Sequence, residues 1–60
     1  MDNDKKNVVE KAIEILENNN KKRMKLMAQT NNEEEKEKHR REINANKSMI
    51  LDYKYRLQYE

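Results

Sequence analysis

The chain has 60 residues, of which 43% are charged and 33% hydrophobic, and its 14 basic and 12 acidic residues leave a formal net charge of +2. A chain this short forms one domain at most, and its core is too small to give more than marginal stability alone. With no Cys and one His, neither a disulfide nor an ordinary zinc site can add stability. Self-association or a partner protein is therefore expected.

The composition also restricts the fold class. Gly and Pro are both absent, and a compact β fold is difficult to build without the residues that form tight turns. Mean hydropathy is −1.52, which is close to the range of disordered chains, but the apolar residues recur at helical spacing. No apolar run approaches the ~18 residues typical of a membrane span. We therefore expect an all-α protein of the cytoplasm, with no membrane partner.

A first helix is predicted over about residues 4–28. At about 100° per residue, its apolar residues share one broad face, made of Val8, Val9, Ala12, Ile15, Leu16, Leu26 and Met27. Asn19, Asn20 and Arg23 fall on the same face. Because Asn has a low helix propensity and tolerates the left-handed conformation, residues 18–20 form a kink, a helix end or a polar layer. We favour a continuous helix with a polar layer.

A turn is predicted at about residues 29–32, where apolar residues are lacking. Thr30 and Glu33 have the spacing of a capping box, and residues 33–35 place three carboxylates where a helix dipole favours negative charge. A second helix is predicted over about residues 33–58. The two arms of similar length predict a single antiparallel helical hairpin over residues 1–60, packed well at its open end and loosely near the turn.

The second helix carries two apolar stripes that point in different directions. One contains Ile43, Ile50, Tyr53 and Leu57, and the other contains Leu51, Tyr55 and Tyr59. The stripes lie roughly 150° apart at about 100° per residue, so one antiparallel neighbour covers only one of them.

This arrangement permits two compatible interpretations. In the first, the hairpin dimerises into a four-helix bundle, and the residues of self-association are Val9, Ala12, Leu16, Ile43, Ile50, Tyr53 and Leu57. In the second, Leu51, Tyr55 and Tyr59 bind a different protein, because tyrosine combines a large apolar body with a polar tip that suits partly hydrated interfaces.

Seven-residue spacing in the second helix places polar residues in the same seam as apolar ones. One core position contains Lys36, Ile43, Ile50 and Leu57, and the other contains His39, Asn46 and Tyr53. Two apolar heptads are too few to define a coiled coil. Asn46 either sets the register by requiring a partner for its amide or lies partly exposed. His39, which stands among charged residues, is expected to be solvated.

Nucleic-acid binding is the alternative from another functional class. A hairpin would bring two basic clusters toward one end, and their residues are Lys21, Lys22, Arg23, Lys25, Arg40 and Arg41. Interleaved glutamates cancel much of this field, and neither a helix-turn-helix pattern nor interleaved aromatic residues accompany it.

Catalysis and cofactor binding are not expected. A nucleophile, a base and an orienting group cannot be assembled around the single His39, and no metal site is expected. The sequence therefore predicts a small non-enzymatic protein-binding regulator or inhibitor, and its many Lys and Asn residues suit an AT-rich genome such as that of a low-GC bacterium, its phages or a mobile element. A structural assembly component is a further alternative.

Overall fold

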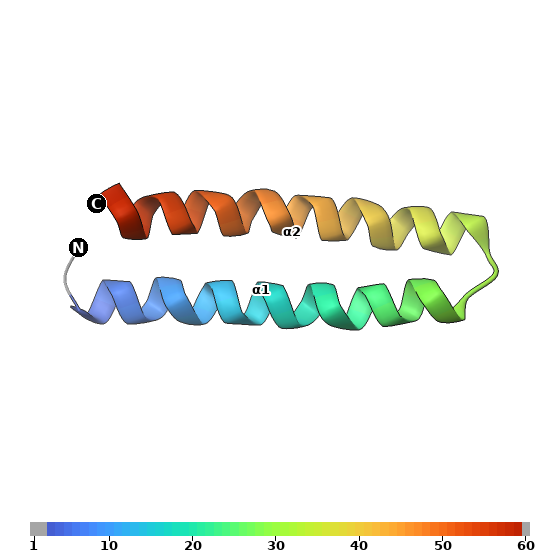
Figure 1. Ribbon diagram of the computed structural model, residues 1–60, viewed down its shortest axis with the longest axis horizontal. Helices are drawn as coiled ribbons and strands as arrows, with labels where there is room; N and C mark the ends of the chain where they lie inside the picture. Colours follow the sequence, from blue (N-terminus) through green and yellow to red (C-terminus); the bar gives the residue numbers. More distant parts are fainter. Residues whose placement is uncertain (1–2, 60) are drawn as a thin grey trace.

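The computed structural model describes residues 3–59 as two long helices that lie side by side and run in opposite directions (Figure 1). Helix α1 spans Asn3–Gln29 and helix α2 spans Glu33–Tyr59, and residues 30–32 join them. The molecule measures 45 × 14 × 10 Å. The predicted all-α antiparallel hairpin is confirmed, whereas dimerisation into a four-helix bundle stays a prediction.

Helix α1 continues through residues 18–20, as the polar-layer interpretation predicted. Asn20 and Asn46 are each only 7% exposed and meet between the helices. Nδ2 of Asn46 donates hydrogen bonds to Oδ1 of Asn20 at 2.9 Å and to Oδ1 of Asn19 at 3.2 Å. Because buried amides are tolerated when they are hydrogen-bonded, this polar layer does not interrupt the helix. Asn46 is thus buried with a partner and not partly exposed.

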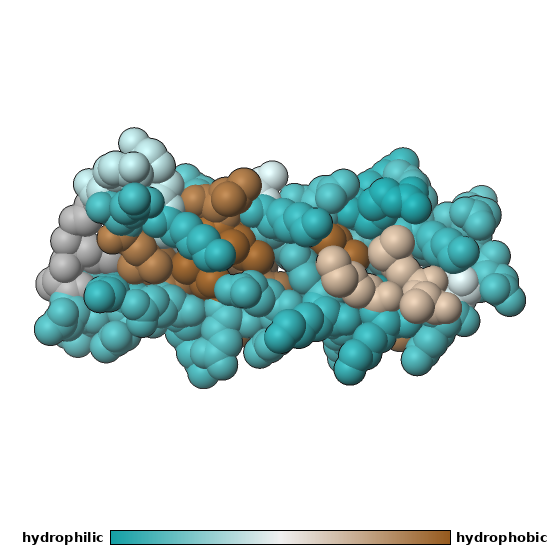
Figure 2. Space-filling view, viewed as in Figure 1, coloured by the Kyte–Doolittle hydropathy of each residue, from teal (hydrophilic) through white to brown (hydrophobic). Residues whose placement is uncertain are grey.

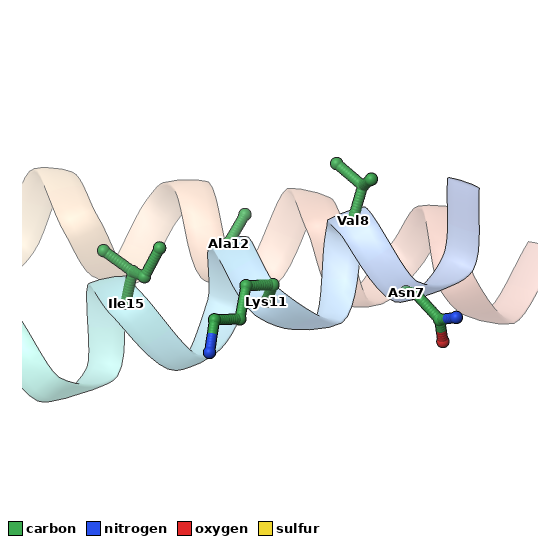
Figure 3. Close-up of a pocket in the computed structure, with 5 residues that line it drawn as sticks. All are labelled: Asn7, Val8, Lys11, Ala12 and Ile15. Atoms are coloured by element: carbon green, nitrogen blue, oxygen red, sulfur yellow. The ribbon is translucent and has the colours of Figure 1, made fainter. Parts of the chain in front are cut away.

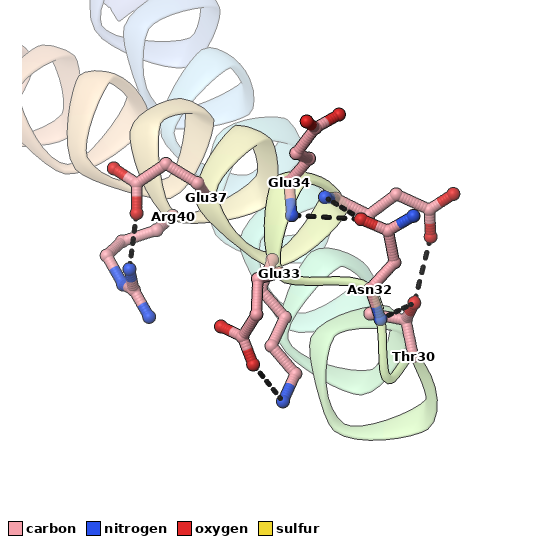
Figure 4. Close-up of polar contacts among 8 residues, drawn as sticks. Thr30, Asn32, Glu33, Glu34, Glu37 and Arg40 are labelled. Atoms are coloured by element: carbon pink, nitrogen blue, oxygen red, sulfur yellow. Dashed lines mark hydrogen bonds and ion pairs between the residues drawn. The ribbon is translucent and has the colours of Figure 1, made fainter.

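The turn is built around a helix cap at Asn32 (Figure 4). Its Oδ1 accepts hydrogen bonds from the backbone N–H groups of Glu34 at 2.9 Å and Glu35 at 3.2 Å. The predicted capping box between Thr30 and Glu33 is therefore wrong. The Thr30 hydroxyl instead donates to Oε2 of Glu35 at 2.9 Å and accepts from the backbone N–H of Asn32 at 3.2 Å. These bonds satisfy backbone donors that a helix start leaves free.

Three isoleucines form the buried apolar core of the described residues. Ile13, Ile43 and Ile50 are 7%, 5% and 8% exposed. The broad apolar face predicted for α1 is only partly correct, because Val8 is 69% exposed and Ile15 is 58% exposed. A single neighbouring helix covers a narrow stripe, and at about 100° per residue these two side chains lie on its outer flank.

Packing is tighter toward the open end, in agreement with the prediction. No residue between positions 21 and 42 is buried. In this half Arg23 and His39 meet between the helices, where Nη1 of Arg23 donates to Nδ1 of His39 at 3.3 Å. His39 is half-buried, so the expectation that it is solvated was wrong. The heptad position of His39 placed it in the seam, although its neighbours in sequence are charged.

Candidate functional site

The residues predicted for self-association lie mainly in the seam between α1 and α2. Ile43 and Ile50 are buried there, and the remaining residues are half-buried: Val9, Ala12, Leu16, Tyr53 and Leu57. These side chains hold the two helices of one chain together. Their half-exposed edges are what remains for contact with a second copy, so their role in self-association stays a prediction.

The residues predicted for partner binding form an exposed stripe on α2, which we call the tyrosine stripe. Its members Leu51, Tyr55 and Tyr59 are 69%, 61% and 65% exposed. The rings of Tyr55 and Tyr59 contact each other, with centroids 4.6 Å apart and planes tilted by 40°. The prediction that α1 covers only one of the two apolar stripes of α2 is therefore confirmed.

A second apolar surface lies on the outer side of α1 (Figure 3). We call it the Val8 patch, and its residues are Asn7, Val8, Lys11, Ala12 and Ile15. Four of them, Val8, Lys11, Ala12 and Ile15, have the i, i+3, i+4, i+7 spacing of the hole that a coiled-coil helix offers to a side chain of its neighbour. Sequence reasoning did not identify this patch, because it assigned Val8 and Ile15 to the packed face.

The basic residues of the nucleic-acid alternative are only partly available. Lys21, Lys22 and Lys25 are exposed. Arg23 is half-buried in the seam, where its Nε also donates to Oδ1 of Asn19 at 2.9 Å. The other two arginines, Arg40 and Arg41, both form ion pairs with Glu37. The structure thus divides this set into free lysines and engaged arginines.

A groove of about 260 Å³ lies between the helices, and we call it the lysine groove. It is lined by Glu17, Asn20, Lys21, Met24, Lys47, Ile50 and Lys54. Sequence reasoning missed this groove. No contiguous pattern indicates it, because its lysines come from both helices and meet only when the hairpin is closed.

Among residues 3–59, no group of three or more His, Cys, Asp or Glu side chains is arranged to hold a metal ion. Neither helix in that range has a stretch long and apolar enough to cross a membrane. No family model, curated protein or solved structure matches the chain significantly.

Proposed function

We propose that the chain is a small non-enzymatic regulator or inhibitor that self-associates as a helical hairpin and binds a protein partner through the tyrosine stripe. One observation carries this proposal. On one side of α2, the residues Leu51, Tyr55 and Tyr59 are each between 61% and 69% exposed to solvent. Large apolar side chains that are exposed side by side mark candidate interaction surfaces, and tyrosine is enriched among the residues that dominate binding energy.

Self-association is supported by a different surface. The Val8 patch offers a hole for an apolar side chain of another helix. Met49 on α2 is also exposed, by 43%, and it projects away from Lys47 and Lys54 at about 100° per residue. A second hairpin packed against this side would complete a four-helix bundle and leave the tyrosine stripe free.

The nucleic-acid alternative has less support from the geometry. Arg40 and Arg41 share the single carboxylate of Glu37, and Arg23 is hydrogen-bonded to Asn19 and His39. Phosphate binding by these three arginines would compete with those contacts, so only Lys21, Lys22 and Lys25 of the set are free to meet phosphate directly. Protein binding through the tyrosine stripe requires no such rearrangement.

The proposal is tested by Tyr55→Ser/Tyr59→Ser, with Val8→Ser/Ile15→Ser as the matched control. Each variant replaces two exposed apolar side chains with serine, and the two pairs lie on different surfaces. We expect the tyrosine variant to lose the proteins that the immobilised wild-type chain retains from cell extract, while its helicity by circular dichroism is unchanged. The control should retain those proteins but show a lower mass by light scattering.

Three results would count against the proposal. Retention of the same proteins by the tyrosine variant would remove the tyrosine stripe as a binding surface. A large loss of helicity in that variant would show that the stripe stabilises the fold. Particles far larger than a dimer, formed by the wild-type chain alone, would favour the structural-assembly alternative instead.

A further inference from the structure

The lysine groove has a positively charged rim and a floor that is apolar except for the Asn20 amide. Ile50 and Asn20 are 8% and 7% exposed and lie at its base, and Met24 remains 50% exposed beside them. Figure 2 shows patches of hydrophobic residues at the surface between the two helices, with hydrophilic residues around them. An occupant of the groove would therefore bury apolar side chains between charged ones.

The charges around the groove are not balanced within the hairpin. Lys21, Lys47 and Lys54 face one carboxylate, that of Glu17. None of these three lysines forms an ion pair with any of residues 3–59, whereas Lys11 and Lys36 pair with glutamates on their own helices. Three positive charges and one negative charge give the groove a formal charge of +2, which equals the net charge of the whole chain.

The groove is continuous with the tyrosine stripe. Leu51 follows Lys47 by four residues and precedes Lys54 by three, so all three side chains lie on neighbouring positions of one helix surface. A partner segment lying in the groove would reach Leu51 without a gap. The cationic rim and the apolar stripe thus form one surface.

These features select among the possible occupants. A second copy docked groove to groove would bring two sets of three lysines together, and its acidic turn region over residues 29–38 has no apolar side chain to fill the floor. Nucleic acid would meet the lysines but leave Met24 and Ile50 without apolar partners. An amphipathic helix that carries acidic residues beside apolar ones matches both the rim and the floor.

We infer that the lysine groove, together with Leu51, binds an acidic amphipathic helix of the protein partner. The inference rests on the proposed protein-binding function and specifies the chemistry of the partner. The apolar side chains of that helix contact Met24, Ile50 and Leu51. Its carboxylates pair with Lys21, Lys47 and Lys54, which fixes its position along the groove.

The test uses a synthetic peptide of 18 residues as the probe, with Leu at i, i+3, i+4 and i+7 spacing and Glu at the flanking positions. A peptide of the same composition in scrambled order and a polyuridine RNA serve as the comparison ligands. Binding is measured by fluorescence anisotropy against the full chain at low and high salt. We expect binding of the amphipathic peptide that weakens with salt, because screening reduces the attraction between exposed charges.

Charge variants show whether peptide binding depends on the lysines of the groove or only on the net positive charge of the chain. Lys21→Glu/Lys47→Glu/Lys54→Glu is expected to weaken peptide binding by about tenfold or more, the sum of three exposed ion pairs. The neutral variant Lys21→Gln/Lys47→Gln/Lys54→Gln should weaken peptide binding less. It tests the same lysines if the charge-reversed variant does not fold. The control Lys22→Glu/Lys25→Glu/Lys38→Glu, which changes three lysines outside the groove, should bind like the wild type.

Three outcomes would overturn the inference. Equal binding of the scrambled peptide would mean that the apolar floor is not used. Stronger binding of polyuridine would assign the lysines to nucleic acid. Equal loss in the control variant would show that net charge alone matters. Each of these outcomes is separable from failure of the proposed function, which is decided by the tyrosine variant and its protein captures and not by the lysine variants.

Discussion

At the scale of single residues, the register of the hairpin depends on Asn20 and Asn46. The two amides meet in an otherwise apolar part of the seam, between Ile43 and Ile50 of α2 and Ile13 of α1. Sliding one helix by a turn would separate them and leave buried amides unpaired, at a cost of about 1–3 kcal/mol for each unsatisfied group. Buried asparagines of coiled coils define register in the same way.

This pairing makes a prediction about single and double substitutions. Asn46→Leu should lower the free energy of unfolding by about 1–3 kcal/mol, because it leaves the side-chain oxygen of Asn20 buried without its donor, while Nδ2 of Asn20 still donates to the Ile43 carbonyl. Asn20→Leu/Asn46→Leu should be at least as stable as the wild type, since both polar groups are removed together. Urea unfolding followed by circular dichroism measures both changes. A double variant less stable than the single one would refute the pairing.

At the scale of elements, the two helices could be predicted from the sequence. The residue that caps α2 and the residues of α1 that pack against it could be predicted less well. Absence of Gly and Pro and the acidic run at residues 33–35 indicate two helices and a turn. They do not indicate which residue caps α2, because Thr30, Asn31 and Asn32 are all good capping residues. The backbone path of the turn decides in favour of Asn32.

The prediction of which α1 residues pack against α2 was partly wrong for a similar reason. Val8 and Val9, like Ile15 and Leu16, are adjacent apolar residues, so hydrophobicity alone does not tell which of each pair faces α2. The signal that could have decided is the seven-residue spacing of Ile13, Asn20 and Met27, which matches the heptad found on α2. Asn20 weakened that signal, because hydrophobicity does not separate the buried Asn20 from its exposed neighbours Asn18 and Asn19.

The Asn32 cap makes a prediction with a neighbouring control. Asn32→Ala should cost about 1 kcal/mol, because two backbone N–H groups at the start of α2 lose their acceptor. For a domain of this size that loss lowers the melting temperature by roughly 4–8 °C. Asn31→Ala changes an exposed neighbour and should stay within about 0.5 kcal/mol of the wild type. Thermal melts at one protein concentration give both values, and equal effects would argue against the cap.

At the scale of the whole molecule, the hairpin is slender and has a small core. It is 45 Å long but only 14 × 10 Å across, so most side chains touch solvent. Three buried isoleucines supply little of the burial that a stable monomer needs. The lysine groove also exists only at this scale, since Lys21 and Lys47 lie on different helices. That is why a reading of separate sequence segments did not reveal it.

Self-association through the Val8 patch predicts that stability depends on protein concentration. Binding between folded copies stabilises the folded state by mass action, so the melting temperature should rise over a hundredfold increase in concentration. Val8→Ser/Ile15→Ser should remove this dependence and leave the melting temperature close to the wild-type value at low concentration. Circular dichroism melts over that range measure it. A wild-type melting temperature independent of concentration would exclude a dimer as the source of stability.

The position of the core gives the turn a limited role. Ile13 and Ile50 lie toward the open end, far from residues 30–32, so the turn mainly raises the effective concentration of one helix near the other. Each doubling of a flexible connection costs only about 0.6 kcal/mol in closure entropy. A Gly-Ser insertion between Thr30 and Asn32 should therefore be tolerated if the Asn32 cap is kept. The two helices should then still pair when the connection between them is longer, and an unchanged helicity by circular dichroism would show it.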